Sequence, residues 1–213
     1  MQHQDFCSVT AATFSRLADR YAEKYFQLDR YDRFLERFAT RIESPGARIL
    51  DVACGPGNVS AYLSKTRPDL ELIGVDLAEG MVKQARRRVP SAKFMVKDCR
   101  DIGELEQVFD AVVFAFGLSY LTENDATRFF TSLDGILKES ALLYLATITG
   151  NPSESGFTCS SRGDKVYLEY RSINDVVSMI EQAGYRIEFL DVVASPTEAP
   201  KATEDLILIA KKM

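Results

Sequence analysis

The chain has 213 residues, a length that allows one sizeable hydrophobic core and predicts a single domain. Its formal net charge is −5. Hydrophobic residues are 46% and charged residues 27% of the chain, the balance of an ordinary soluble globular protein. The sequence has no apolar run of membrane-spanning length, no secretory pattern at Met1–Asp5 and no basic stripe. We therefore expect a cytoplasmic protein with neither a membrane nor a nucleic-acid partner.

The cysteines give little sign of metal binding. Cys7, Cys54, Cys99 and Cys159 include no C-x-x-C pair, and the chain has a single histidine, His3. We expect free thiols and no bound metal, with the cysteines as small packing residues.

The first elements along the chain are expected to be two helices within residues 10–42. Apolar side chains recur there at three- and four-residue spacing, as in Phe14, Leu17, Ala18, Tyr21 and Tyr25, which is typical of an amphipathic helix. The turn-forming residues 44–46 end this region.

A short apolar strand, 48–52, is predicted next, followed by a glycine turn and a helix from about Asn58. Gly55 and Gly57 allow the backbone to take positive φ and to approach a ligand closely. Asn58 is expected to cap the helix. Asp51 lies at the end of the strand, four residues before Gly55, where its carboxylate can hold a cationic group over the turn.

A second apolar strand, 71–76, ends in Asp76, which lies 21 positions after Gly55. A nucleotide-binding α/β unit places at this distance the carboxylate that accepts the ribose hydroxyls. A helix over 78–89 and a third strand over 93–97 follow. Asp98 is then the third carboxylate to lie near the carboxyl end of a strand.

The remaining pattern predicts further alternation of strands and helices. Residues 109–114 form a nearly continuous apolar run, typical of a parallel strand covered on both faces. The other expected elements are a loop over 115–121, a helix over 124–138, a strand over 141–147, a loop over 149–164, a strand over 165–170, a helix over 172–183, and strands over 185–193 and 204–211.

The stretch from Asp51 to Gly57, Asp-Val-Ala-Cys-Gly-Pro-Gly, resembles the first motif of the class I S-adenosylmethionine-dependent methyltransferases, in which an acidic residue precedes G-x-G by four positions. The resemblance covers roughly residues 15–211. It implies an α/β, Rossmann-like, doubly wound fold with a mostly parallel seven-stranded sheet, one C-terminal antiparallel strand and helices on both faces. It also implies four parts of one domain: a helical lid (1–45), a cofactor-binding core (46–148), a substrate-side loop or hairpin (149–170), and a closing helix with a strand pair (171–213).

The resemblance implies S-adenosylmethionine as cofactor, S-adenosylhomocysteine as product and no metal. Asp51 would hold the methionine amino group, directly or through water, and Asp76 the ribose. Asp98 and the N–H of Cys99 would form hydrogen bonds with the adenine, although Asp98 could instead cap a short helix over 102–107. Further expected cofactor contacts, for which ordinary packing is the alternative at several positions, are Tyr21, Tyr25, Ala53, Cys54, Gly55, Gly57, Asn58, Leu77, Met81, Phe114 and Phe116.

The loop 115–121 resembles the family's fourth motif, which meets both methionine and substrate. It departs from that motif at Ala115, where the family often has Asn, and at Ser119, where it often has His. An Asn-Pro-Pro-Tyr motif is also missing, which disfavours amide and base nitrogens as acceptors.

Tyr120 is the candidate catalytic residue, named as a substrate contact because a phenol with a pKa near ~10 is a poor base. Phe157, Arg162 and Tyr167 are candidate substrate contacts, unless 149–164 is a plain surface loop.

These features predict in-line methyl transfer to an unidentified small-molecule acceptor by a monomer or homodimer. Three alternatives stay open: a nicotinamide-dependent oxidoreductase, an aminopropyl transferase that uses the decarboxylated cofactor, and a non-catalytic protein that binds S-adenosylmethionine for regulation.

Overall fold

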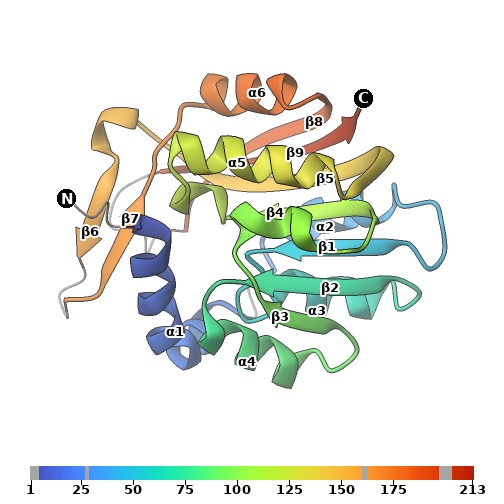
Figure 1. Ribbon diagram of the computed structural model, residues 1–213, viewed down its shortest axis with the longest axis horizontal. Helices are drawn as coiled ribbons and strands as arrows, with labels where there is room; N and C mark the ends of the chain where they lie inside the picture. Colours follow the sequence, from blue (N-terminus) through green and yellow to red (C-terminus); the bar gives the residue numbers. More distant parts are fainter. Residues whose placement is uncertain (1–4, 27–28, 160–162, 197–202) are drawn as a thin grey trace.

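The computed structural model describes residues 5–26, 29–159, 163–196 and 203–213. Its main sheet has seven strands in the order β3-β2-β1-β4-β5-β9-β8 (Figure 1), and β9 alone runs in the direction opposite to the other six. The predicted fold class is confirmed. The strands are β1 (Arg48–Val52), β2 (Glu71–Asp76), β3 (Lys93–Val96), β4 (Phe109–Ala115), β5 (Leu137–Thr149), β8 (Tyr185–Ala194) and β9 (Glu204–Lys212).

Helices cover both faces of the sheet because neighbouring residues of each strand point to opposite sides. Leu50 of β1 belongs to the core under α5 (Glu123–Asp134) and α6 (Ile173–Gln182). Ile49 belongs to the opposite core, under α2 (Asp32–Ala39) and α3 (Asn58–Thr66). A smaller cluster joins α4 (Glu79–Arg88) to β3.

The first helix, α1 (Phe6–Tyr25), lies across the carboxyl ends of the parallel strands rather than on a face of the sheet (Figure 1). It packs between α4 and a two-stranded hairpin of β6 (Gly156–Cys159) and β7 (Lys165–Leu168). Short 3-10 helices are η1 (Cys99–Glu104), η2 (Leu118–Tyr120) and η3 (Pro152–Glu154). No described helix is both long enough and apolar enough to cross a bilayer.

Two sequence predictions about boundaries are wrong. The helix expected over 124–138 ends at Asp134, and Leu137 already belongs to β5, where it pairs with Phe109. The apolar Ile136 and Leu137 fit the helical period as well as a strand, so periodicity could not separate them. The cap of α3 is Gly57, with φ of 91°, and Asn58 is the first residue of the helix.

The segment expected as a loop over 149–164 contains η3 and β6, and β7 ends at Leu168 rather than at residue 170. The resemblance implies a loop or a hairpin over 149–170, and β6 and β7 form a hairpin there. Ser172 and Asp175 form a reciprocal capping box at the start of α6, the pattern in which each side chain accepts from the other residue's N–H.

Candidate active site

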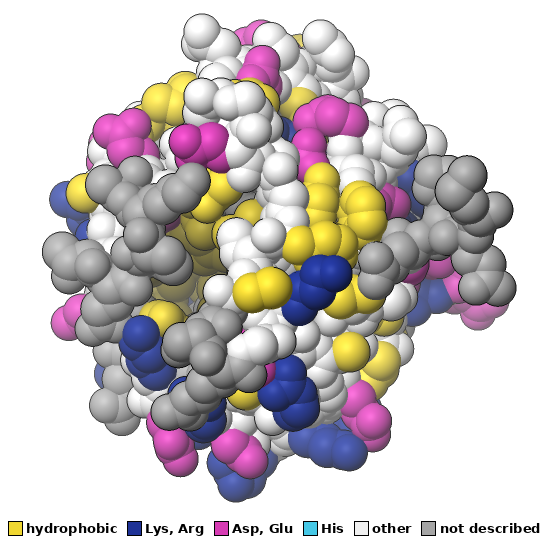
Figure 2. Space-filling model, turned by 90° about the vertical axis from the view of Figure 1, so that its left-hand side faces the viewer, with side chains coloured by type: hydrophobic (Ala, Val, Ile, Leu, Met, Phe, Trp, Pro, Cys, Tyr) yellow, Lys and Arg dark blue, Asp and Glu magenta, His cyan; other side chains and the backbone are white. Residues whose placement is uncertain are grey.

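A pocket opens at the carboxyl ends of the strands, at the point where the strand order reverses between β1 and β4. Open α/β sheets bind ligands at such a switch point. The pocket contains about 750 Å³ not filled by protein atoms, part of it open to solvent. Figure 2 shows hydrophobic side chains inside a hollow on this face of the molecule. Lining residues are Cys7, Thr10, Ala11, Phe14, Tyr21, Ala53, Gly55, Asp76, Leu77, Ala78, Met81, Asp98, Cys99, Phe114, Ala115, Phe116, Gly117, Tyr120 and Leu121.

The backbone is strained where β1 and β4 reach the pocket. Ala53 has φ of 52° and Phe116 has φ of 62°, values that cost free energy in residues with a Cβ. Gly117 follows Phe116, and a Cβ there would stand 2.7 Å from the Cβ of Ala53 and 2.1 Å from a ring atom of Phe114. The two strand ends therefore meet closely at the floor of the pocket.

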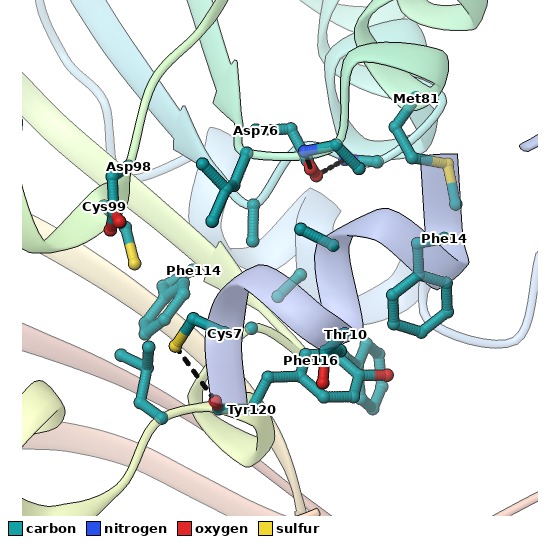
Figure 3. A pocket seen from close by; sticks show the side chains of 18 of the residues that line it. Cys7, Thr10, Phe14, Asp76, Met81, Asp98, Cys99, Phe114, Phe116 and Tyr120 are labelled. Atoms are coloured by element: carbon teal, nitrogen blue, oxygen red, sulfur yellow. Dashed lines mark hydrogen bonds between the residues drawn. The ribbon is translucent and has the colours of Figure 1, made fainter. Parts of the chain in front are cut away.

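Asp76 is fixed by two backbone donors. Its Oδ2 accepts from the N–H of Gly55 at 2.9 Å and its Oδ1 from the N–H of Ala78 at 2.8 Å. Burial raises the pKa of Asp76, while the two N–H donors oppose that shift. Each carboxylate oxygen can accept a further hydrogen bond, so this group can meet a diol in the pocket (Figure 3).

Asp98 and Cys99 lie at one end of the pocket in Figure 3. Asp98 caps η1, where its side chain accepts from the N–H of Arg100 at 2.9 Å, and it also pairs with the Arg100 guanidinium. The structure thus shows the capping role that the sequence left open, although the helix begins at Cys99. As the first residue of η1, Cys99 has no intrahelical partner for its N–H, which leaves that donor suited to an acceptor in the pocket.

Arg100 is surrounded by three carboxylates. Its guanidinium pairs with Asp5 at 2.8 Å, Asp98 at 2.6 Å and Asp125 at 3.2 Å. Asp5 caps the start of α1 by accepting from Cys7 and Ser8. Hydrogen bonding to Arg100 lowers the pKa of Asp5 to about 2. The end of α1 over the pocket is therefore joined to η1 and α5.

The C-terminal end and the middle of α1 also form hydrogen bonds, to α3 and α4 respectively. The carbonyl of Tyr25 accepts from Nδ2 of Asn58 at 2.6 Å. Oγ of Ser15 accepts from the N–H of Gly80 at 2.8 Å. A Cβ at Gly80 would lie 2.2 Å from the Ser15 carbonyl oxygen. The helices α1 and α4 therefore approach each other at a distance that only glycine permits.

Two threonines of α1 hold the hairpin. Oγ1 of Thr13 donates to the carbonyl of Lys165 at 2.7 Å, and Oγ1 of Thr10 accepts from the N–H of Tyr167 at 3.0 Å. These bonds satisfy backbone groups of β7 on its outer edge. The hairpin and α1 therefore form one connected cover beside the pocket.

The loop after β4 is supported from beneath by a buried guanidinium. Arg171, which is 3% exposed, donates to the carbonyls of Leu118 at 3.1 Å and Leu121 at 2.8 Å. Ser119 lies 3.0 Å from Oγ1 of Thr147. These contacts hold η2 in the position that presents Tyr120 to the pocket.

Asp51 lies beneath the glycine turn, 2% exposed, and is not a lining residue. Its Oδ2 accepts from Oγ of Ser60 at 2.6 Å. Burial is the main cause that raises its pKa to about 7. The neighbouring Oδ1 of Asn58 is also buried and has no hydrogen-bond partner among the described residues.

Most predicted site residues come together, but not all. Lining residues that the sequence predicted are Tyr21, Ala53, Gly55, Asp76, Leu77, Met81, Asp98, Cys99, Phe114, Phe116 and Tyr120. Predicted residues outside the lining set are Tyr25, Asp51, Cys54, Gly57, Asn58, Phe157 and Tyr167. Arg162 lies outside the described residues.

Met81 is 3% exposed and packs with Ala18 of α1. Figure 3 places it on the far side of Asp76 from Asp98. Packing against α1 is therefore one role of this side chain, and its contact with an adenine stays a prediction.

Phe157 and Tyr167 form an aromatic cluster with Phe6. Tyr167 stacks on Phe6 with ring centroids 4.5 Å apart, and Phe157 meets Phe6 edge-on at 5.3 Å. The cluster joins the hairpin to the beginning of α1 instead of lining the pocket.

The sequence patterns did not predict a site role for the pocket-lining residues at the beginning of α1. Cys7, Thr10, Ala11 and Phe14 recur at three- and four-residue spacing, and this periodicity was the available signal. It identifies an inward face but not whether that face meets a core or a ligand.

The fold and the pocket define a nucleotide-binding α/β protein whose sheet is closed by an antiparallel strand. Residues 49–140 match the family of methyltransferase domains. Demethylmenaquinone methyltransferase of Thermotoga maritima is 30% identical over 162 residues, which cover 73% of this chain and 67% of that protein. Trans-aconitate 2-methyltransferase of Variovorax paradoxus is 29% identical over 108 residues, 49% of this chain and 42% of that protein.

Among solved structures, magnesium protoporphyrin IX methyltransferase from Synechocystis with bound S-adenosylhomocysteine superposes with a TM-score of 0.70 at 16% identity. The match covers 99% of this chain and 100% of that chain, and it shows a shared fold. The chain spans about two thirds of the Thermotoga relative and less than half of the Variovorax relative. The chain belongs to the class I S-adenosylmethionine-dependent methyltransferases, and these comparisons give no support to the nicotinamide or regulatory alternatives.

Proposed function

We propose that the protein transfers a methyl group from S-adenosylmethionine to a small-molecule acceptor. The single observation that carries this proposal is the placement of Asp76. Its carboxylate is fixed by the N–H groups of Gly55 and Ala78 at the end of β2 and faces the pocket. A carboxylate held there suits a ribose diol, and membership of the family makes S-adenosylmethionine the expected nucleoside.

The chain has a matching group for each polar part of this cofactor. Asp76 would hold the ribose, and Asp98 with the N–H of Cys99 would hold the adenine. Asp51 and Oδ1 of Asn58 are buried acceptors beside the glycine turn without a cationic partner among the described residues. A buried acceptor without a cation is costly, so these two suit the methionine ammonium group, reached directly or through water.

When bound, S-adenosylmethionine supplies an electrophilic methyl group on a sulfonium. In an in-line displacement the bond from carbon to sulfur breaks, its electron pair stays on sulfur, and a bond forms between the methyl carbon and the acceptor atom. A proton on the acceptor atom leaves to solvent. The contribution of the protein is orientation and the exclusion of water, for which α1 and the loop 115–121 cover the pocket.

Tyr120 is proposed to contact the acceptor rather than to act as a base. Burial raises the pKa of its phenol, which keeps the hydroxyl protonated and able to donate a hydrogen bond. In the four-part division proposed for the domain, α1 of the segment 1–45 would cover the cofactor, 46–148 would bind it, 149–170 would flank the acceptor, and 171–213 would close the sheet.

Titration calorimetry with S-adenosylhomocysteine, with NAD as control, tests the proposal. We expect binding in the micromolar range for S-adenosylhomocysteine and no measurable heat for NAD. Binding of NAD alone would overturn the cofactor assignment.

A further inference from the structure

One side of the pocket, the aromatic wall, is lined by four aromatic side chains that come from two separate segments. Phe14 and Tyr21 belong to α1, while Phe116 and Tyr120 belong to the loop after β4. The Phe14 ring meets Tyr120 edge-on at 5.2 Å and Tyr21 at 5.7 Å. The labelled rings of Phe14, Phe116 and Tyr120 lie on the side of the pocket away from Asp98 (Figure 3).

The charges around the pocket are unfavourable for an anionic acceptor. Asp76 and Asp98 are the charged residues among the described lining residues, and no described lysine, arginine or histidine lines the pocket. Arg100 lies close by, but Asp5, Asp98 and Asp125 already surround its guanidinium. A carboxylate acceptor would lose its hydration beside two acidic side chains without gaining a cationic partner there, which is costly.

A cationic acceptor is disfavoured by the chemistry of the donor. A protonated amine has no lone pair to attack the methyl group. Its positive charge would also be repelled by the sulfonium at a short distance and in a poorly solvated pocket. An uncharged acceptor avoids both costs.

The polar groups of the aromatic wall are hydrogen-bond donors. Burial raises the pKa of Tyr21 to about 12, and it raises the pKa of Tyr120 further, so both phenols stay protonated near neutral pH. Oγ1 of Thr10 already accepts from Tyr167. The aromatic wall can therefore donate hydrogen bonds to an oxygen of the methyl acceptor. It contains no group that could act as a base and remove a proton from that oxygen.

We propose that the acceptor is an uncharged, planar aromatic molecule that carries a hydroxyl or carbonyl oxygen and binds between α1 and the loop 115–121. This inference rests on the proposed methyl transfer and adds the substrate class. Ring faces of Phe14, Phe116 and Tyr120 would contact the aromatic plane, and aromatic contacts stabilise such pairs beyond their buried area. With a hydroxyl as acceptor, a bond from oxygen to the methyl carbon would form while the bond from that carbon to sulfur breaks and leaves its electron pair on sulfur. The hydroxyl proton would pass to solvent, and S-adenosylhomocysteine would leave as the thioether.

The test is an assay of S-adenosylhomocysteine formation by the full chain with S-adenosylmethionine and either of two probes. One is 1,4-naphthohydroquinone, kept reduced without oxygen, and the other is the tricarboxylate trans-aconitate. We expect product with the naphthohydroquinone and none above background with trans-aconitate. Turnover of trans-aconitate with equal or greater kcat/KM, or turnover of neither probe, overturns the acceptor class. Calorimetry with S-adenosylhomocysteine, run first, decides separately whether the cofactor proposal fails.

Two variants refine the test. Phe14→Leu removes a ring from the wall, so KM for the naphthohydroquinone should rise about fivefold, while affinity for S-adenosylhomocysteine changes less than twofold. Arg20→Ala, on the exposed side of the same helix, should leave both values unchanged. A KM that does not rise in Phe14→Leu, or that rises as much in Arg20→Ala, contradicts the inference.

Discussion

The guanidinium of Arg100 donates to both carboxylate oxygens of Asp5, at 3.1 Å and 2.8 Å. Because Asp5 caps α1 and Arg100 belongs to η1, this pair joins the helix that covers the pocket to the segment that carries Asp98. The same guanidinium pairs with Asp98. The position of α1 and the adenine contact proposed for Asp98 are thereby connected through a single side chain.

The Asp5–Arg100 pair gives α1 a defined pH dependence. The folded-state pKa of Asp5, about 2, lies below the ordinary value of about 3.9 for an unfolded chain. The stabilisation is therefore present above pH ~4 and is lost as pH falls towards 2. In hydrogen exchange at pH 5 we expect Asp5→Asn to raise exchange in the first turns of α1.

The matched control for that experiment is Asp175→Asn at the start of α6. It should raise exchange in α6 and leave α1 unchanged. Equal protection of α1 in wild type and Asp5→Asn at pH 5 would show that the pair does not fasten the helix.

Asp76→Asn should weaken binding of S-adenosylhomocysteine by about 10- to 100-fold, because hydrogen bonds to a charged group contribute about 1.5–3 kcal/mol. The measurement is titration calorimetry, with the thermal midpoint checked in parallel. Asp69→Asn changes a half-exposed carboxylate paired with Arg67 and should leave affinity unchanged. Unaltered affinity in Asp76→Asn contradicts the ribose assignment.

Binding of S-adenosylhomocysteine should release a proton from Asp51 near neutral pH. Its folded-state pKa of about 7 lies above the ordinary value, so the contribution of Asp51 to the stability of the apo protein is fully present below pH ~4 and is lost as pH rises through 7. An ammonium group nearby favours the ionised carboxylate. Affinity should consequently rise between pH 6 and 8, and calorimetric heats in phosphate and Tris should differ.

Asp51→Asn is the control for this linkage. It should flatten the pH dependence between 6 and 8 and remove the difference between the two buffers. Identical heats for the wild-type protein in both buffers would exclude a proton-linked role for Asp51.

Gly117→Ala should lower the free energy of unfolding by about 1–3 kcal/mol, the usual cost of overpacking. The added Cβ would collide with Phe114 and Ala53, so the loop that carries Tyr120 must move. Gly135→Ala is the matched control, because a Cβ there meets nothing within 4 Å. Urea unfolding measures both variants, and equal stabilities would argue against the close packing at Gly117.

Arg171→Met should lower the free energy of unfolding by about 2–6 kcal/mol, since two buried carbonyls lose a donor at about 1–3 kcal/mol each. The local signature is faster amide exchange in residues 117–121. Glu123→Gln removes only the partner that is 64% exposed, so its effect should stay below about 1 kcal/mol. If both variants unfold alike and exchange in 117–121 is unchanged, Arg171 does not support the loop.

The sequence by itself determined that the main sheet has seven strands, that a glycine turn follows the first of them, and that three carboxylates lie near strand ends. These features depend on local causes: apolar runs form buried strands, glycine allows positive φ, and parallel strands bring their carboxyl ends to one edge. Asp76, Asp98 and Gly55 therefore fall in the pocket as predicted. The prediction that this helix extends to residue 138 is wrong, because Ile136 and Leu137 fit the period of a helix as well as that of a strand. Pairing of Leu137 with Phe109 of β4 decides for the strand.

Only the tertiary structure decided what covers the site. Phe14 and Thr10 lie about 60 residues from Asp76 along the chain, and no spacing rule connects them. Their position depends on contacts between distant segments: Asp5 with Arg100, Ser15 with Gly80, and Thr13 with the hairpin. Arg171 belongs to the same group, because its side chain meets the loop 118–121 only once the sheet has formed. Local patterns set the floor of the pocket, while long-range packing sets its walls and hence the space left for an acceptor.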